Sequence, residues 1–457
     1  MVDVGRRSGG ARAGRAPPHR APHAGHLRPS RRALLVGAAA AGGAALAAAC
    51  GAGPGQPPVP GAAPRAGAPA GTVQHVYWGG AVEAPLQYAI DRFPERVAGG
   101  RVDLLAIPNA QVLEQLQLLA AAGTPPDTAQ INPRIITPLI SKGLLYSITD
   151  YAKRDAREFQ QDDFYPAALE RLIKGGRLYG APVQMGLFVL IYNQDLLAAA
   201  GERPPDDTWT WDTLAAAAKR LTAGEGDGKR FGVTAPPWEI LVWAYGGEIL
   251  DQAEKVCLLT DPKAQAGLQW LQDLRHKHQA APRPGEVTGM TNQQLFLAGR
   301  LAMSVVIPGF VNDIEKGAPP FRWDLAFVPK GPARRATIVQ GPSSAVVAGT
   351  KQPDLAWEWL KWWTGVEVRR FAAREERAVG ARKSGAAEYL KLPPPPANRK
   401  ALVDSAHFAR NQPYIAQYDE MTRIITAEWD AALARNEKSI KEATESAKRQ
   451  IDSLLAG

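Results

Sequence analysis

The chain has 457 residues, of which 45% are apolar and 22% are charged, ordinary values for a globular protein. This length and composition allow two or three domains with a large buried core and exclude a mostly disordered chain. The net charge of +9 is concentrated at one end, because residues 1–49 contain eight Arg and one Asp. The rest of the chain holds 46 of the 54 basic and 44 of the 45 acidic residues, so it is nearly neutral, which argues against a nucleic-acid partner.

The first fifty residues have the pattern of an export signal. Arg31 and Arg32 precede an Ala-rich apolar run over 33–49, and a charged segment, a short apolar segment and small residues before a cleavage site are typical of a secretory signal. The arginine pair also resembles the twin-arginine export signal. Residues 1–49 are therefore interpreted as a signal peptide of the twin-arginine type, with general secretion as the other route.

The end of this run, Leu46-Ala47-Ala48-Ala49-Cys50, resembles the lipobox of bacterial lipoproteins. The resemblance implies that Cys50 is acylated and holds the protein at the outer face of the bacterial cell membrane. A transmembrane anchor made by the same run is the alternative, although its Ala- and Gly-rich sequence is short for a span. Residues 50–71 are rich in Gly, Pro and Ala, which predicts an extended tether, so the folded body starts near Thr72 and faces outside the cytoplasm.

The folded body alternates between strand-like and helix-like patterns. Residues 73–78 alternate in hydrophobicity and end at Gly79-Gly80, which predicts a strand followed by a turn. Apolar side chains recur at helical spacing over 112–122 and Gly123 follows, which predicts a helix. The same criteria predict extended segments at 102–107, 128–131, 178–192, 231–234, 325–329 and 345–348, and helices at 84–93, 135–142, 209–221, 263–279, 354–364 and from 414 to the end. Strands and helices in alternation predict mostly parallel sheets covered by helices.

The residues that catalysis or metal binding would need are absent or badly spaced. Four His follow the signal, and His276 and His278 would point in different directions from one helix. Cys50 and Cys257 are the two cysteines, so no disulfide framework is available. The segment 341–345 lacks the second Gly of a nucleophile elbow, and no Walker loop is present. We therefore expect no catalytic residues, no metal site and no cofactor.

Tryptophan is the most informative residue type, because all 12 Trp lie beyond the signal. The four Trp within 357–363 have helical spacing, which favours core packing. Trp78, Trp209 and Trp238 instead follow strand ends or lie in Gly- and Pro-rich connections, where α/β folds place ligands. Because aromatic faces stack on the apolar faces of sugar rings, each of these three is either a packing residue or a binding residue.

Six short motifs follow one another across about 380 residues. They are Gly123-Thr124-Pro125-Pro126-Asp127 with Gly143-Leu144-Leu145, Tyr179-Gly180-Ala181-Pro182 with Ile191-Tyr192-Asn193 and Gly201, Thr208-Trp209-Thr210-Trp211, Tyr245-Gly246-Gly247-Glu248 with Asp251, Gly299-Arg300-Leu301-Ala302-Met303 within 296–309, and Ala356-Trp357 to Trp363. Their order resembles that of the extracellular solute-binding proteins of family 1, the sugar-binding subunits of ABC importers.

The resemblance implies an α/β protein with the two-lobed, type II periplasmic-binding-protein fold. Each lobe would be a mostly parallel sheet flanked by helices, with the ligand cleft between the lobes. One lobe would consist of residues 72–182 plus 308–354, and the other of 186–307 plus 355–457. The lobes would close about the hinge, and the transporter would recognise the closed conformation.

Matching the motif loops to the family implies a set of ligand-binding positions. They are Trp78, Gly79, Asn132, Gln184, Met185, Trp238, Phe310, Gly341 and Tyr414. Phe310 stands where many relatives have Trp, and Met185 stands where relatives often have a carboxylate or an aromatic side chain. The competing interpretation of each residue is ordinary packing or loop structure.

The implied function is that of the substrate-binding subunit of an ABC importer, which captures a mono- or oligosaccharide and delivers it to a membrane permease. We expect its partners to be the solute, the transmembrane subunits of the permease and the membrane through the lipid, and we expect a monomer that is not an enzyme. A non-sugar solute such as glycerol phosphate is an alternative, for which Arg134 is a candidate cation. The competing hypotheses are an exported carbohydrate-active enzyme with a carboxylate pair and an exported structural or adhesion protein without a small-molecule site.

Overall fold

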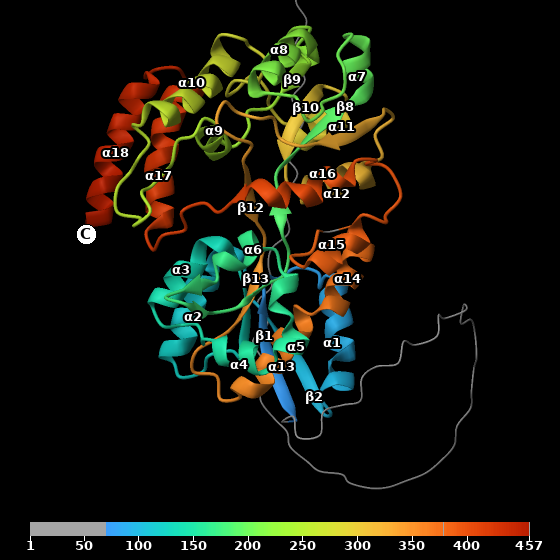
Figure 1. The fold of residues 1–457 in the computed structure, drawn as a ribbon, viewed down its shortest axis with the longest axis vertical. Helices are drawn as coiled ribbons and strands as arrows, with labels where there is room; N and C mark the ends of the chain where they lie inside the picture. The colour runs from blue at the N-terminus through green and yellow to red at the C-terminus, as the bar shows by residue number, and fades with distance from the viewer. Residues whose placement is uncertain (1–69, 378, 457) are drawn as a thin grey trace, which may run out of the picture. The chain divides into compact units, whose positions relative to one another are not determined.

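The computed structural model describes residues 70–377 and 379–456, which Figure 1 shows as a ribbon coloured along the chain. The predicted signal peptide 1–49, the lipobox with Cys50 and nearly all of the predicted tether lie outside the described residues. None of the helices in the described part of the chain combines the length and the apolar composition that a bilayer span needs.

A five-stranded sheet forms the centre of what we call the first lobe. Its strand order is β2-β1-β3-β13-β6, and the strands are β1 (Gly71–Tyr77), β2 (Gly100–Ala106), β3 (Thr128–Ile131), β6 (Ala181–Pro182) and β13 (Ser343–Val346). β1 is parallel to β2 and β3, whereas β13 is antiparallel to β3 and β6. The parallel strands need crossover connections, which α1 (Ala84–Arg96) and α2 (Val112–Ala121) supply.

A four-stranded sheet forms the centre of the second lobe. Its order is β11-β8-β10-β9, and the strands are β8 (Val189–Asn193), β9 (Phe231–Val233), β10 (Leu301–Val306) and β11 (Trp323–Ala326). β10 is parallel to β9, and β8 is antiparallel to β10 and β11. Both sheets therefore contain more antiparallel strand pairs than the alternation of strands and helices predicts. The reason is that a strand that arrives from the other lobe runs antiparallel to its neighbours.

Short helices cover the two sheets. The remaining elements of the first lobe are α3 (Pro133–Ser141), α4 (Thr149–Arg154), α5 (Ala156–Phe159), α6 (Pro166–Glu170), β4 (Ile173–Lys174), β5 (Arg177–Leu178), α13 (Pro353–Trp363), α14 (Val366–Glu375) and α15 (Lys383–Tyr389). Those of the second lobe are α7 (Gln194–Ala199), α8 (Trp211–Leu221), α9 (Trp238–Ala244), α10 (Pro262–His276), α11 (Asn292–Leu297), α12 (Pro308–Gly317), α16 (Arg399–Asp404), α17 (Tyr418–Trp429) and α18 (Ile440–Ala456). Proline occupies the first turn of α1, α3, α10, α12 and α13, where its missing N–H leaves no hydrogen bond unmade.

Within residues 70–456, three segments carry the chain between the lobes. The first runs from β6 through β7 (Gly186–Leu187) to β8, and the second runs from β12 (Thr337–Gln340) to β13. These two crossings are paired, because β12 is antiparallel to β7, and β12 also pairs with β14 (Ala409–Arg410). The third crossing leads from α15 through the proline run 393–396 to α16. Figure 1 shows β12 between the two lobes.

The division of the chain between the lobes differs from the predicted one in two places. Residues 308–336, predicted for the lobe of 72–182 plus 308–354, carry β11, which pairs with β8 in the second lobe. The helices α13 and α14, predicted for the lobe of 186–307 plus 355–457, pack against α1, and α13 also contacts β1 and β13. The prediction placed the second and third crossings at 308 and 354, whereas the chain crosses at β12 and again after α15.

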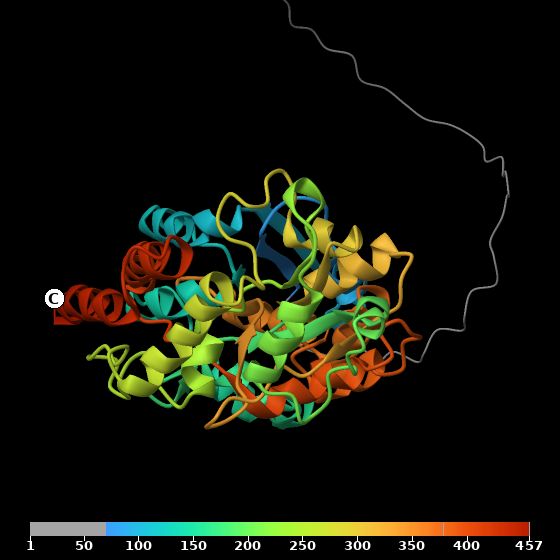
Figure 2. The ribbon, with the colours of Figure 1, turned by 90° about the horizontal axis from the view of Figure 1, so that it is seen from above.

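The end of the chain returns to the second lobe. The helix predicted from Tyr414 onward is two helices, α17 and α18, separated by a π-helical turn at 430–434 and a loop. Gln272 of α10 donates from Nε2 to the carbonyl of Ala432 at 3.0 Å, and the backbone N–H of Cys257 donates to Asp452 of α18 at 2.7 Å. Figure 2 shows these red C-terminal helices at one side of the body.

The Trp-rich helix α13 is a core element, as its spacing predicts. Its four Trp side chains are at most 7% exposed. His75 of β1 is fully buried beside them, with its ring centroid 5.6 Å from that of Trp359 and its Nδ1 2.8 Å from Thr128 Oγ1. Because burial disfavours the charged imidazolium, it lowers the pKa of His75 to about 3.

This buried histidine predicts a loss of stability in acid. The unfolded chain protonates His75 at its ordinary pKa of 6.5, whereas the folded protein does so only near pH 3, so the free energy of unfolding should fall as the pH drops below 6.5. The contribution of this one residue is about 1.4 kcal/mol for each pH unit in that window. Urea unfolding of the full chain at a series of pH values measures the slope.

Two variants separate this histidine from other titrating groups. His75→Asn should flatten the slope, because no imidazole remains to be protonated on unfolding. His407 is exposed, so His407→Asn should keep the slope of the unmodified protein. An undiminished slope in His75→Asn would contradict the assignment.

Candidate functional site

Two adjoining cavities lie where the lobes face each other. The first encloses about 810 Å³ and has walls from both lobes and from the crossing strands. The second encloses about 660 Å³ and has its walls on the second lobe and on the crossing strand β12. Ile307 and Gln340 line both, so the two cavities adjoin at these residues. Each volume falls in the range of small-molecule sites.

The first cavity lies at the carboxyl edge of the first sheet. Trp78 follows β1, Asn109 follows β2 and Asn132 follows β3, and all three line the cavity. Parallel strands end at the same edge of a sheet, which is where α/β folds bind ligands. Trp78 Nε1 donates to the carbonyl of Gln130 at 3.1 Å. This bond engages the indole N–H, so what Trp78 can offer the cavity is the apolar surface of its ring.

Asn132 organises the start of α3. Its Oδ1 accepts from the backbone N–H of Arg134 at 3.0 Å, so it is the N-cap of the helix, and its Nδ2 donates to Oδ1 of Asn109 at 2.5 Å. The amide of Asn132 is therefore largely engaged by the protein. The sequence analysis did not single out Asn109, whose amide nitrogen donates no hydrogen bond to another described residue.

The first cavity contains one cationic and one anionic side chain. Arg134 of the first lobe lies with its guanidinium carbon 5.8 Å from the ring centroid of Tyr418 in the second lobe, a cation–π distance. Asp419, the residue next to Tyr418, lines the same cavity. The wall as a whole is therefore not biased toward one sign of charge.

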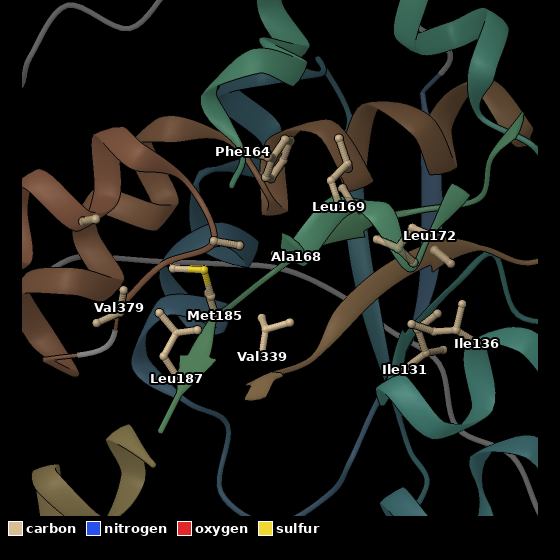
Figure 3. Packing of buried hydrophobic residues seen from close by; sticks show 14 of the residues in the cluster. Ile131, Ile136, Phe164, Ala168, Leu169, Leu172, Met185, Leu187, Val339 and Val379 are labelled. Carbon is tan, nitrogen blue, oxygen red and sulfur yellow. The ribbon is translucent and has the colours of Figure 1, made fainter. Parts of the chain in front are cut away.

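The crossing segments form the floor of the first cavity. The backbone N–H of Met185 donates to the carbonyl of Val379 at 3.1 Å, and the Met185 side chain, 1% exposed, packs beside Leu187 and Val379 in the core that Figure 3 shows. Met185 is thus mainly a packing residue at the cavity edge. Gln184 lines the cavity beside it, and none of the side-chain hydrogen bonds of the described residues uses its amide.

Gly341 makes the tight turn between β12 and β13. Its φ is +118°, and a Cβ there would lie 2.4 Å from the carbonyl oxygen of Gln184, so only glycine fits. The carbonyl of Gly341 accepts a 2.8 Å hydrogen bond from Nη2 of Arg171, which fixes the peptide in the cavity floor.

Four aromatic side chains line the second cavity. Trp238 and Phe310, both predicted site residues, line it together with Phe188 and Trp429. The rings of Trp238 and Trp429 are T-shaped, with centroids 5.6 Å apart and planes at 80°. Trp429 is 7% exposed, and its Nε1 has no partner among the described residues. The indole of Trp238 is half-buried and presents part of its surface to the cavity.

Tyr414 closes the first cavity from the second lobe. The side chain is 8% exposed, and its hydroxyl donates to Oε1 of Gln412 at 2.8 Å. Gln412 in turn donates from Nε2 to Oε1 of Glu239 on α9. Burial raises the pKa of the Tyr414 phenol, and it also raises the pKa of Glu239 to about 6.

The structure places eight of the nine predicted contact residues in the walls of the two cavities. Gly79 is the exception: its φ of +82° serves the turn after β1, and it lines neither cavity. Sequence reasoning missed Asn109, Gln340 and Trp429. The position of Asn109 after a parallel strand is a signal that could have found it, whereas Trp429 sits in a helix with ordinary core spacing. That the eight residues contact a ligand stays a prediction.

The described residues contain no group of three or more His, Cys, Asp or Glu side chains arranged to hold a metal ion. Cys257 is buried, and its burial raises the pKa of the thiol to about 11. The resulting thiol is poorly ionised at neutral pH.

Comparison with known proteins identifies the family. Residues 79–370 match the family described as bacterial extracellular solute-binding proteins. The match covers more than half of the chain, and the chain belongs to this family, as the motif order predicts.

Relatives in sequence cover much of the same body. A binding protein of Brucella abortus is 25% identical over 327 residues, which are 70% of this chain and 77% of that protein. The arabinooligosaccharide-binding protein of Bacillus subtilis is 24% identical over 286 residues, which are 60% of this chain and 64% of that protein.

Solved structures share the fold. An ABC substrate-binding protein from Listeria monocytogenes, in complex with cycloalternan, has a TM-score of 0.74 at 21% identity and covers 84% of this chain and 98% of its own. A sugar-binding protein from Xanthomonas citri has a TM-score of 0.75 at 18% identity, with 84% and 98% covered. These similarities confirm the predicted two-lobed, type II periplasmic-binding-protein fold.

Proposed function

We propose that this solute-binding protein captures a mono- or oligosaccharide outside the cytoplasm and delivers it to the membrane subunits of an ABC importer. Membership of the family supports solute binding. Similarity to an arabinooligosaccharide-binding protein and a galactooligosaccharide-binding protein of Bacillus subtilis supports a sugar as the solute. The observation that carries the proposal is the combination of aromatic side chains with uncharged amides in two adjoining cavities.

The chemistry of these walls suits a sugar. A sugar ring has apolar C–H faces and a rim of hydroxyls, so it needs flat aromatic surfaces and neutral hydrogen-bonding groups. Trp78 and Trp238 offer the aromatic surfaces, one in each cavity. The amides of Asn109, Gln184 and Gln340 line the first cavity, and amides both donate to and accept from hydroxyls.

Capture would work by closure of the lobes about the crossing strands β7 and β12. We take the lobes as residues 71–182 plus 343–390 and residues 189–336 plus 399–456. A ligand that contacts both lobes favours the closed state by the difference between its affinities for the two states. The sugar is released unchanged, so the protein acts as a binding protein and not as an enzyme, and it does so as a monomer.

Arg134 favours the second candidate, a phosphate-bearing solute such as glycerol phosphate. Its guanidinium is a cation at the first cavity and could pair with a phosphate group. Asp419 lines the same cavity and repels an anion, and among the described residues no second cation lines this cavity. The neutral sugar is therefore the better match to the described wall.

A thermal-shift panel tests the function directly. The full chain would be mixed separately with glucose, maltose, maltotriose, an arabino-oligosaccharide, a galacto-oligosaccharide and glycerol 3-phosphate. At a hundredfold excess over Kd, a bound sugar should raise the Tm by about a few degrees, because it stabilises the folded state alone by about 2.7 kcal/mol. Chromatography of the recovered sugar should show no product. A shift with glycerol 3-phosphate alone, or cleaved sugar, would reject the proposal.

Trp238→Ala tests the aromatic wall. Removing the indole should weaken sugar binding roughly tenfold or more, since truncated aromatic anchors cost about 1–2 kcal/mol or more. Titration calorimetry measures the affinity, and urea unfolding measures the stability. Trp209→Ala is the matched control, because Trp209 is 7% exposed and packs in the core of the second lobe outside both cavities. Trp209→Ala should lower the free energy of unfolding and leave the affinity for sugar unchanged. If Trp238→Ala also lowers stability and leaves the affinity unchanged, Trp238 is a core residue.

We also propose that the protein is held at the outer face of the cell membrane by a lipid on Cys50. Cys50→Ser should release the protein from the membrane fraction of expressing cells into the soluble fraction, because the acylated thiol is lost. Fractionation and immunoblotting measure the distribution. A variant that stays with the membrane would show that the apolar run over 33–49 is itself the anchor.

A further inference from the structure

A hydrogen-bonded chain connects a buried carboxylate to the wall of the first cavity. Glu239 lies in the first turn of α9, is 8% exposed and lines neither of the two cavities. It accepts from Nε2 of Gln412, and Oε1 of Gln412 accepts from the hydroxyl of Tyr414 at 2.8 Å. Glu239 and the cavity residue Tyr414 are thus joined through one amide.

The ionised carboxylate sets the direction of every bond in this chain. A carboxylate only accepts hydrogen bonds, so Gln412 must turn its NH₂ group toward Glu239. The side-chain carbonyl of Gln412 then faces Tyr414, and the phenol must donate its single O–H to that carbonyl. The oxygen of Tyr414 keeps only lone pairs for other partners, which makes it an acceptor.

The surroundings of Glu239 contribute few charges. Those that act on the carboxylate and its chain are Arg134 of α3, Arg171 just after α6, and the phenols of Tyr414 and Tyr418. On its other side α9 packs against Gly267 of α10, whose Cα faces the Leu241 carbonyl. Burial is the largest influence, and it raises the pKa of Glu239 to about 6. The carboxyl therefore changes its protonation state close to neutral pH.

We propose that Glu239 is a positioning residue for ligand binding, which acts through Gln412 to hold Tyr414 in the cavity wall with its hydroxyl oxygen as an acceptor. The inference rests on the proposed binding of a solute in the first cavity. It adds a selectivity rule: the group that meets Tyr414 must be a hydrogen-bond donor, such as a sugar hydroxyl. A phosphate or carboxylate oxygen would meet the lone pairs of Tyr414 and be disfavoured.

The first test needs no ligand. In the full chain, Glu239→Gln lets the Gln412 amide turn over, so the segment 411–417 should exchange its backbone amides with deuterium several-fold faster at pH 7.5. Gln412→Ala breaks the same chain from a loop residue and should have the same effect, which covers the case that the Glu239 variant does not fold. Unchanged exchange in both variants would overturn the proposal.

The second test measures affinity for the sugar that gives the largest shift in the thermal panel. Glu239→Gln should weaken it by about fivefold at pH 7.5, the factor between a charge-assisted and a neutral hydrogen bond. In the unmodified protein the affinity should fall as the pH drops from 7.5 to 5, because Glu239 becomes protonated, and Glu239→Gln should abolish this pH dependence.

A double-mutant cycle and a matched control test whether Glu239 acts through the hydroxyl of Tyr414. In a Tyr414→Phe background, Glu239→Gln should have no further effect on affinity, because the hydroxyl that it orients is gone. Glu428 of α17 is another buried glutamate of the second lobe, bonded to Lys438 and Ser446, so Glu428→Gln should leave the pH profile of binding unchanged.

The outcomes distinguish the two proposals. If none of the panel sugars binds, the proposed function fails, and the exchange experiment still shows whether Glu239 holds Tyr414 in place through Gln412. If a sugar binds while Glu239→Gln alters neither its affinity nor its pH profile, the function stands and the positioning role is rejected. Additive effects of the two substitutions would also reject it, because they would show that Glu239 does not act through the hydroxyl.

Discussion

The side-by-side crossing of β7 and β12 is the joint on which both lobes depend. The two strands pair at Leu187 with Val339 and at Gly186 with Gln340, and Gly341 follows at once with a turn that has no room for a side chain. Both cavities have walls on this joint, because Gln340 lines each of them. One short piece of paired backbone therefore fixes the positions of the aromatic residues on either side of it. Any motion of one lobe against the other must bend here and in the third crossing.

The polar groups of the cavity walls are partly committed to the protein itself. Trp78 donates its N–H to Gln130, Asn132 caps α3, and Tyr414 donates to Gln412. What these residues retain for a ligand are aromatic faces and accepting oxygens, while the amides of Asn109, Gln184 and Gln340 can still donate. Under the proposed function, such a wall would recognise a neutral molecule by its shape and its pattern of hydroxyls. This is the physical sense in which the site is suited to a carbohydrate.

Sequence patterns predict the elements well and the division between lobes poorly. The helix of α13 and the strands β1 and β3 follow from local periodicity, and the cavity positions after those strands follow from the rule that parallel strands end at one edge. The crossing points depend on pairing between residues such as Leu187 and Val339, which are far apart in the chain and leave no local signal. The role of Glu239 is hidden for the same reason, since its partner Gln412 is 173 positions away.

The path of the chain has a consequence for how the protein folds. The second lobe begins near β8 but is completed by α17 and α18, which pack on each other, with α18 also packing on α10. Between the two parts of the second lobe, the chain crosses to the first lobe, where β13 and α13 join the core. Neither half can be cut out as one continuous piece, and the core of the second lobe cannot be complete until α17 and α18, far along the chain from β8, have joined it.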